Sequence, residues 1–154
     1  KDLFQGKRVV LTPIAANSPA QVKVLEKTWI RLKAKVSRMS PAKHDAVFAA
    51  VSHLPHLLAY GLVSEIAGRR NSKQLFGYAA GGFRDFTRIA SSHPEMWRDI
   101  SVANRDFLLK EIRGFESVLK KIKATLKKRN AKALEKLFAR ARSARERWLK
   151  GAAR

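Results

Sequence analysis

The sequence has 154 residues, of which 45% are hydrophobic, and this suits one globular domain with a core. It contains no cysteine, so disulfides, thiolate metal sites and a cysteine nucleophile are excluded. Lys and Arg number 33 against 12 Asp and Glu, and the net charge of +21 favours anionic partners, from a small carboxylate to a polyanion.

Residues 6–13, Gly-Lys-Arg-Val-Val-Leu-Thr-Pro, predict a short strand because the run is β-branched, begins at Gly and ends at Pro. The pattern indicates no second strand. Since a single strand cannot form a sheet, we expect this one to belong to a sheet outside the chain or to be swapped onto a partner.

From residue 18 onward the pattern is helical. Ser18-Pro19 and Ser40-Pro41 are each typical of a helix start, with a capping Ser followed by Pro. Apolar residues at helical spacing predict a helix over 19–32 and a longer one over 41–67. Pro55 lies inside the longer helix and predicts a kink there, because it removes a backbone donor.

The second half predicts further helices. Residues 72–82 indicate a loop with one helical turn at most, and 83–91 a short helix. Ser92, with Glu95 three residues later, predicts a capping box that opens a helix reaching about residue 128. A last helix follows the break at 127–130. The predicted fold class is therefore an all-α helical bundle preceded by one strand.

Residues 46–64 contain no Lys, Arg, Asp or Glu, which raises the question of a membrane span. Ser52, His53 and His56 at the centre of this stretch favour a buried core helix instead. The N-terminal residues also lack the apolar run of a signal peptide. We therefore expect a cytoplasmic protein without membrane contact.

His53 and His56 are three residues apart and share a helix face. They are either ligand contacts or histidines that pack between helices. A metal pair is disfavoured, because His44 lies about half a turn round the helix from His53 and no other third ligand is apparent.

Gly81-Gly82 lets the backbone approach another group closely, but without a preceding strand or a third Gly it is not a dinucleotide-binding loop. In the residues that follow, Asp85 and Arg88 are spaced to form an ion pair. Arg84 and Arg88 repel each other unless an anion lies between them. The Arg fork matches a carboxylate, and a surface salt bridge is the equally simple alternative.

Trp97 follows the Ser92 start and reads as an aromatic core anchor, although a Trp near a Gly-Gly turn can also wall a ring-binding pocket. Residues 117–154 hold fourteen Lys or Arg and two Glu, spread around both helices, which favours a solvated surface. No Ser-His-Asp order, carboxylate pair or phosphate-binding loop stands out. The pattern therefore indicates half of an active site.

Taken in order, these segments resemble prephenate dehydrogenase, the oxidoreductase of tyrosine and hence aromatic amino acid biosynthesis. The resemblance is carried by Val9-Val10-Leu11-Thr12-Pro13, His44-Asp45, Ser52-His53-Leu54-Pro55-His56, the run from Gly81 to Ala90, the run from Pro94 to Ile100, and Asn104. It implies a two-domain enzyme. An N-terminal Rossmann domain binds NAD or NADP and carries the catalytic His, and a C-terminal helical domain dimerises and closes the substrate pocket.

Carried over to this sequence, the resemblance implies that Arg88 holds a substrate carboxylate and that His56 contacts prephenate or the inhibitor tyrosine. Asp85 would position neighbouring groups, and Gly82 and Trp97 would line the pocket. No catalytic, cofactor-binding or metal-binding residue is expected in this chain.

We expect residues 1–15 to be the last strand of the missing dinucleotide-binding domain, and 16–154 to be the helical dimerisation and substrate-binding domain. The chain alone should neither bind a nicotinamide cofactor nor oxidise prephenate, and should form a homodimer through helices 41–67 and 94–128. Two alternatives remain. One is a basic helical module that binds nucleic acid, non-specifically through charge; the other is a structural dimer without enzymatic activity.

Overall fold

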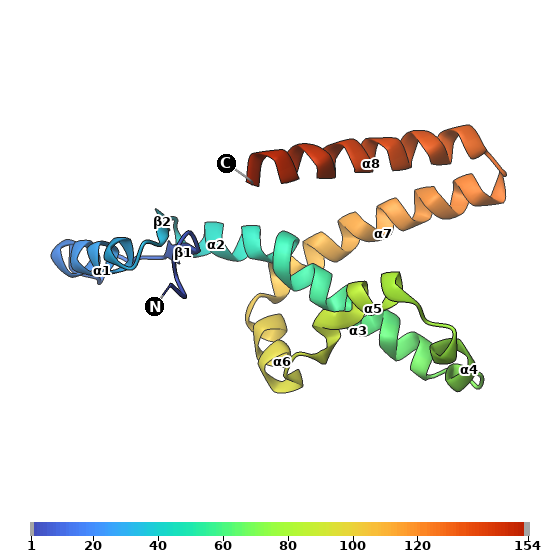
Figure 1. The fold of residues 1–154 in the computed structure, drawn as a ribbon, viewed down its shortest axis with the longest axis horizontal. Coiled ribbons are helices and arrows are strands. Elements are labelled where there is room, and N and C mark those ends of the chain that lie inside the picture. Colours follow the sequence, from blue (N-terminus) through green and yellow to red (C-terminus); the bar gives the residue numbers. More distant parts are fainter. Residues whose placement is uncertain (1, 153–154) are drawn as a thin grey trace. The chain divides into compact units, whose positions relative to one another are not determined.

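The computed structural model describes residues 2–152 (Figure 1). The chain forms two compact units, residues 1–109 and 110–154. The first contains a short β-α-β segment followed by helices, and the second contains a helical hairpin. The predicted all-helical class is confirmed by this element order.

The N-terminal strand has a partner. Strand β1 (Arg8–Leu11) pairs in parallel with β2 (Lys35–Arg38), and helix α1 (Pro19–Arg31) connects them. The expectation of a solitary strand is therefore wrong. The second strand escaped the pattern because it is only four residues long, Lys-Val-Ser-Arg, and mostly polar, as edge strands often are.

A sharp reversal returns the chain from α1 into β2. Lys33 adopts a positive φ of 62°, and the next residue, Ala34, is buried and donates its N–H to the Trp29 carbonyl at 3.1 Å. Phe4 packs edge-on against the Trp29 ring, with centroids 4.9 Å apart. Together with buried Leu11, these residues form the small core of the β-α-β segment.

The long apolar helix predicted over 41–67 is continuous but not regular. It consists of α2 (Pro41–Phe48), a π-helical turn η1 (Ala49–His53) and α3 (Leu54–Ala67). Pro55 cannot donate to the preceding turn, and the irregularity that it predicts takes the form of this wider turn directly before it. Ser40 caps the start as predicted, since its hydroxyl accepts a bond from the backbone N–H of the third residue.

Three short helices follow and pack against α3: α4 (Ser72–Gly77), α5 (Gly81–Thr87) and the 3-10 helix η2 (Arg88–Ser91). The Tyr60 hydroxyl on α3 donates to the Ser92 carbonyl at 2.6 Å. This bond ties the end of η2 to the long apolar helix.

Two details of the next segment differ from expectation. Helix α6 (Pro94–Ala103) is preceded by His93, whose side chain makes no capping bond, so the capping box at Ser92 is wrong. The helix predicted to run on to about residue 128 is interrupted at Asn104, and α7 (Arg105–Lys127) begins after it. Asn104, the residue at the interruption, is buried, and its side chain is bonded to residues of the long apolar helix.

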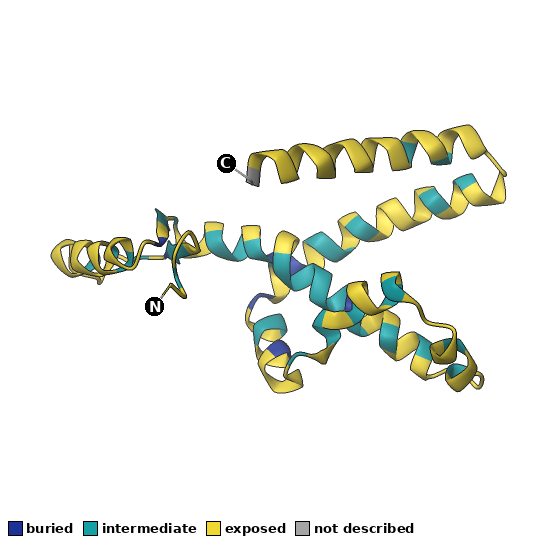
Figure 2. Ribbon diagram, in the orientation of Figure 1, coloured by how far each residue is buried: buried dark blue, intermediate teal, exposed yellow. Residues whose placement is uncertain are grey.

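In the second unit, the C-terminal part of α7 and helix α8 (Ala131–Ala152) form the hairpin, with the turn where the sequence predicts a break. Figure 2 shows α8 exposed along nearly its whole length. The uncovered side chains include large apolar ones: Leu119 is 49% exposed, Phe138 56% and Trp148 66%. Such a surface is typical of an interface.

Within the described residues, one helical stretch, Pro41–Ala67, is long and apolar enough to cross a membrane by length and composition alone. A helix that packs inside a protein passes the same test. Its central polar side chains, His53 and His56, both have hydrogen-bond partners within the chain, and this favours the packed alternative.

Leu108 at the start of α7 is 3% exposed, whereas its neighbour Leu109 is 44% exposed. Leu108→Ala should lower the free energy of unfolding by about 2–5 kcal/mol, because it removes a buried side chain and leaves a cavity. Leu109→Ala, the same change on the outer side of the helix, should cost much less. Urea denaturation of both variants measures this, and equal losses would contradict the packing.

Candidate ligand site around Trp97

The centre of the candidate site is Trp97 on α6, which is 8% exposed. The imidazole of His56 stacks on the indole, with ring centroids 3.6 Å apart and an interplanar angle of 18°. His53 meets the same indole edge-on, at 6.0 Å and 77°. The two histidines thus share a helix face, as their spacing predicts, and that face is directed at Trp97.

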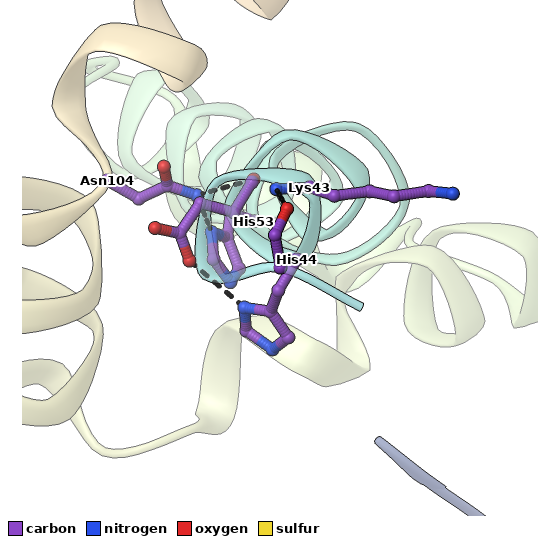
Figure 3. A network of polar contacts seen from close by, with 6 residues as sticks. Lys43, His44, His53 and Asn104 are labelled. Carbon is purple, nitrogen blue, oxygen red and sulfur yellow. Dashed lines mark hydrogen bonds and ion pairs between the residues drawn. The ribbon is translucent and has the colours of Figure 1, made fainter. Parts of the chain in front are cut away.

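Asn104 connects this cluster to the start of the long apolar helix. Its side chain is 7% exposed, and its Nδ2 donates to the Asp45 carbonyl and to Nδ1 of His53, both at 2.9 Å (Figure 3). A backbone carbonyl can only accept, so the NH2 end of the amide must face it. Nδ1 of His53 is therefore the acceptor, and the neutral ring carries its proton on Nε2.

His56 has the opposite arrangement. Its Nδ1 lies 2.9 Å from the Ser52 carbonyl, which can only accept, so this nitrogen carries the proton. As neutral rings, the two imidazoles that contact Trp97 are therefore opposite tautomers: His53 carries its proton on Nε2, and His56 carries its proton on Nδ1.

The surroundings keep His53 uncharged. Burial is the largest influence and lowers the pKa of His53 below its ordinary value, and the neighbouring His44 and His56 lower it further. Asp45 acts in the opposite direction and raises it. The lowered pKa agrees with the hydrogen bond from Asn104, which only the neutral ring can accept.

The Asp45 carboxylate is also engaged. Nδ1 of His44 lies 3.0 Å from Oδ1 of Asp45, and the His44 ring packs on Phe48 with centroids 4.3 Å apart. Asp45 thus contacts His44 through its side chain and Asn104 through its backbone carbonyl. Both contacts lie close to the π-helical turn.

Two buried polar atoms in this cluster have no hydrogen-bond partner among the described residues: Nε1 of Trp97 and Oδ1 of Asn104. An unpaired buried polar group costs about 1–3 kcal/mol and is uncommon in folded proteins. Beside Trp97 lies an open cavity of about 220 Å³. It is lined by Leu57, Tyr60, Pro94, Trp97, Arg98 and Ser101. Trp97 therefore carries an unpaired donor and also lines an open cavity, and this combination makes it the centre of a candidate ligand site.

The other predicted site residues lie on a separate segment. Gly82 and Asp85 are on α5, Arg88 begins η2, and all three are exposed. Within residues 2–152, neither Asp85 nor Arg88 makes an ion pair, so the pairing that their spacing allows is not formed. The structure joins His56 to Trp97 and leaves the guanidinium of Arg88 without a partner in this part of the chain.

Metal binding finds no support in the described part of the chain, where no three His, Asp or Glu side chains gather closely enough to hold an ion. Sequence reasoning underrated Asn104, which carried part of the family resemblance but no assigned role. The available signal was its spacing: Asn104 follows Trp97 by seven residues, which places both on the same helix face.

Comparison with known proteins identifies the domain. The family described as "Prephenate dehydrogenase, dimerization domain" matches residues 40–140. A cyclohexadienyl dehydrogenase of Zymomonas mobilis is 35% identical over 147 residues, covering 94% of this chain and 50% of that protein. A prephenate dehydrogenase of Bacillus subtilis is 36% identical, covering 94% of this chain and 39% of that protein.

Among solved structures, prephenate dehydrogenase from A. aeolicus in complex with hydroxyphenyl propionate and NAD+ has a TM-score of 0.83 and 37% identity. The match covers 97% of this chain and 51% of that one. The chain therefore belongs to the prephenate dehydrogenase dimerization domain family, and it spans about half the length of the relatives that it matches, or less.

The lowered pKa of His53 predicts how stability changes with pH. As the pH falls below the ordinary histidine value of 6.5, the unfolded chain takes up a proton at His53 that the folded chain resists. The free energy of unfolding should therefore fall between about pH 7.5 and about pH 5.5. His53→Gln keeps an acceptor for Asn104 but cannot titrate, so it should weaken this dependence.

Urea denaturation at several pH values provides the measurement. His93→Gln is the matched control, because His93 is exposed and its side chain caps nothing. If His53→Gln leaves the slope against pH as steep as in the wild-type chain, the assignment of a half-buried His53 with a lowered pKa is wrong.

Proposed function

We propose that this chain is the substrate-binding and dimerisation domain of a prephenate dehydrogenase. Such an enzyme converts prephenate to 4-hydroxyphenylpyruvate by NAD(P)-dependent oxidative decarboxylation, in tyrosine biosynthesis in the cytoplasm. The observation that carries the proposal is the His56–Trp97 stack, which lies beside an open cavity within the residues that the family match covers.

The chemistry of the ligand fits these residues. Prephenate has a six-membered ring and two carboxylates, so its site needs a flat apolar wall and cationic groups. Trp97 offers the wall and His56 a polar edge beside it. Arg88 offers two parallel donors that match a carboxylate, and in the described chain its fork is not occupied by an acidic side chain. The same residues suit tyrosine as a second ligand.

Asp85 and Gly82 support this arrangement in the proposal. Asp85 lies one helical turn before Arg88 and can restrain the guanidinium when a ligand orders it. Gly82 is the second residue of the same helix, and a Cβ added there would meet no atom within 4 Å, so the backbone is open to a ligand or a second chain.

The cofactor belongs, in this proposal, to the rest of the parent enzyme. The residues present do not fit a dinucleotide: the loop between β1 and α1, Thr-Pro-Ile-Ala-Ala-Asn-Ser, contains no glycine that would let the backbone approach a pyrophosphate. No step of the reaction is therefore assigned to a nicotinamide bound by this chain.

We also propose that the domain boundary lies near residue 39. The sequence predicted it at residue 15, but β1, α1 and β2 form one connected β-α-β unit that ends at Arg38, and the family match begins at residue 40. A parallel pair joined by a crossover helix is the repeating element of a dinucleotide-binding domain. The helical domain would then be residues 40–154.

A homodimer follows from the pattern on the two long helices. In α7, apolar residues alternate at spacings of four and three from Leu108 to Leu126, and α8 continues the pattern from Leu134 to Trp148. This heptad spacing is typical of helices that pack along a seam. Because several of these side chains are exposed in a single chain, a second copy is the partner that we propose to cover them.

The dimer can be tested by one substitution on the seam and one beside it. Leu119 and Val118 are 49% and 40% exposed, but only Leu119 falls in the heptad pattern. Light scattering at high salt should give twice the 17.4 kDa chain mass for the wild type and for Val118→Glu. Leu119→Glu should give the single-chain mass. A monomeric wild type would contradict the proposed dimer. A monomeric Val118→Glu together with a dimeric Leu119→Glu would contradict the proposed position of its interface.

The role of Arg88 is tested in the complete dehydrogenase. Arg88→Ala should raise the Michaelis constant for prephenate about tenfold to a hundredfold, because a charge-assisted bond contributes about 1.5–3 kcal/mol. The affinity for the nicotinamide cofactor should change little. Steady-state kinetics with prephenate and cofactor varied separately give both constants.

Arg84→Ala is the control, since it removes the same exposed cation one turn earlier on the same segment. If Arg84→Ala weakens prephenate binding as much as Arg88→Ala does, the carboxylate lies elsewhere along this helix and the assignment of Arg88 is incorrect.

A further inference from the structure

The bonds of the Asn104 side chain have a consequence for the two histidines at Trp97. We propose that Asn104 is a positioning residue. Its amide fixes His53 in the neutral tautomer with the proton on Nε2 and holds that ring beside Trp97 and His56.

The side-chain nitrogen of Asn104, Nδ2, carries two hydrogens, and both are donated: one to the Asp45 carbonyl and one to Nδ1 of His53. An ionised Asp has the same shape and no hydrogen to give, and Ser has only one. Position 104 therefore needs a side chain with two donor hydrogens on one nitrogen, and a side chain of the same size without them does not suffice.

The anchor for this amide is rigid. The Asp45 carbonyl also accepts the backbone N–H of Ala49 inside the helix, so both of its lone pairs are occupied and its direction is set by the helix. Asn104 itself is 7% exposed and lies at the break between α6 and α7. With one hydrogen of Nδ2 directed at this carbonyl, the second is directed at Nδ1 of His53, 2.9 Å away.

The result is a pair of imidazoles with opposite tautomers on one indole. The Ser52 carbonyl holds the proton of His56 on Nδ1, whereas Asn104 holds that of His53 on Nε2. Without Asn104, the ring of His53 would lose its only described hydrogen bond and would exchange between its two tautomers. Nothing but packing would then hold that ring edge-on against Trp97. The surface that Trp97 and His56 offer to a ligand would then be less defined.

The tautomers can be observed directly in the 154-residue chain by nitrogen NMR of labelled histidine at about pH 8.5, where histidine is uncharged. Single His→Gln variants assign the signals. His53 should show an unprotonated, pyridine-type Nδ1 and a protonated Nε2, and His56 the reverse. A protonated Nδ1 on His53 in the wild-type chain would overturn the proposal without any further variant.

Asn104→Asp then tests the cause. Since a carboxylate only accepts, His53 should move its proton to Nδ1 while His56 keeps its pattern. Asn71→Asp is the matched control, because it makes the same charge change at an exposed amide whose side chain caps nothing, and should leave His53 unchanged. A His53 pattern that survives Asn104→Asp overturns the proposal.

Circular dichroism establishes whether Asn104→Asp folds. If it does not, Asn104→Ser takes its place: with one donor instead of two, it should give a mixture of both His53 tautomers. A His53 spectrum identical to that of the wild type would overturn the proposal in that case.

The effect on a ligand rests on the proposed function and is measured in the complete dehydrogenase. Asn104→Asp should raise the Michaelis constant for prephenate about tenfold, through the altered ring pair, with the cofactor constant unchanged. A switched tautomer with an unchanged prephenate constant would overturn the positioning role. If His56→Ala and Arg88→Ala also leave that constant unchanged, the proposed substrate site is wrong, whatever the tautomer of His53.

Discussion

The arrangement of the site depends on a single buried amide that joins segments far apart in the sequence. Asn104 bonds to Asp45, 59 residues earlier, and to His53, 51 residues earlier. Asn104 lies at the break between α6 and α7, which are two helices where the apolar pattern runs on as one. Trp97 lies on the short helix that this break creates. The break therefore sets where the indole meets the two histidines.

The π-helical turn, Ala49–His53, is the second feature that determines how the site residues lie. On a regular helix, His44 and His53 would lie on opposite sides, so their positions in the sequence argue against a contact between them. A π turn holds an extra residue and rotates the following residues relative to the preceding ones. His44 consequently lies close enough to His53 to affect its pKa, and Asp45 lies between them in the bonding network. Pro55 supports this geometry because it has no N–H to restore a regular turn.

Most of the secondary structure could be predicted from the sequence, because it follows from local signals. The Ser-Pro starts before α1 and α2 and the break after α7 lie where capping and turn chemistry place them. Strand β2 could not be found, since its Lys-Val-Ser-Arg sequence acquires its structure only by pairing with β1. The break at Asn104 could not be found either, because the residue at the break is bonded to a helix some fifty residues away, and local propensity does not contain such a contact.

The contacts among the candidate site residues could be predicted only in part. The spacing of His53 and His56 gives a shared face, yet only the structure shows that the face meets Trp97. Arg88 and Asp85 have the spacing of an ion pair, but an exposed pair gains little energy, so spacing alone does not bring the side chains together. What the pattern could identify was the kind of group present, and tertiary contacts decided which groups act on each other.

The net charge of +21 attracts anions over a longer distance than the hydrogen-bonding groups of the candidate site do. Several carboxylates form ion pairs with an arginine, as in Glu26–Arg38, Glu65–Arg69 and Glu146–Arg142. Because Lys and Arg number 33 against 12 Asp and Glu, most of the positive side chains have no acidic side chain to balance them. That excess attracts any anion, but at physiological salt its influence fades beyond about 8 Å from the surface. It can raise the encounter rate with a dicarboxylate, yet it cannot tell one anion from another. Discrimination must come from groups held at fixed positions, and around Trp97 the rings of His53 and His56 are held by hydrogen bonds to Asn104 and to the Ser52 carbonyl.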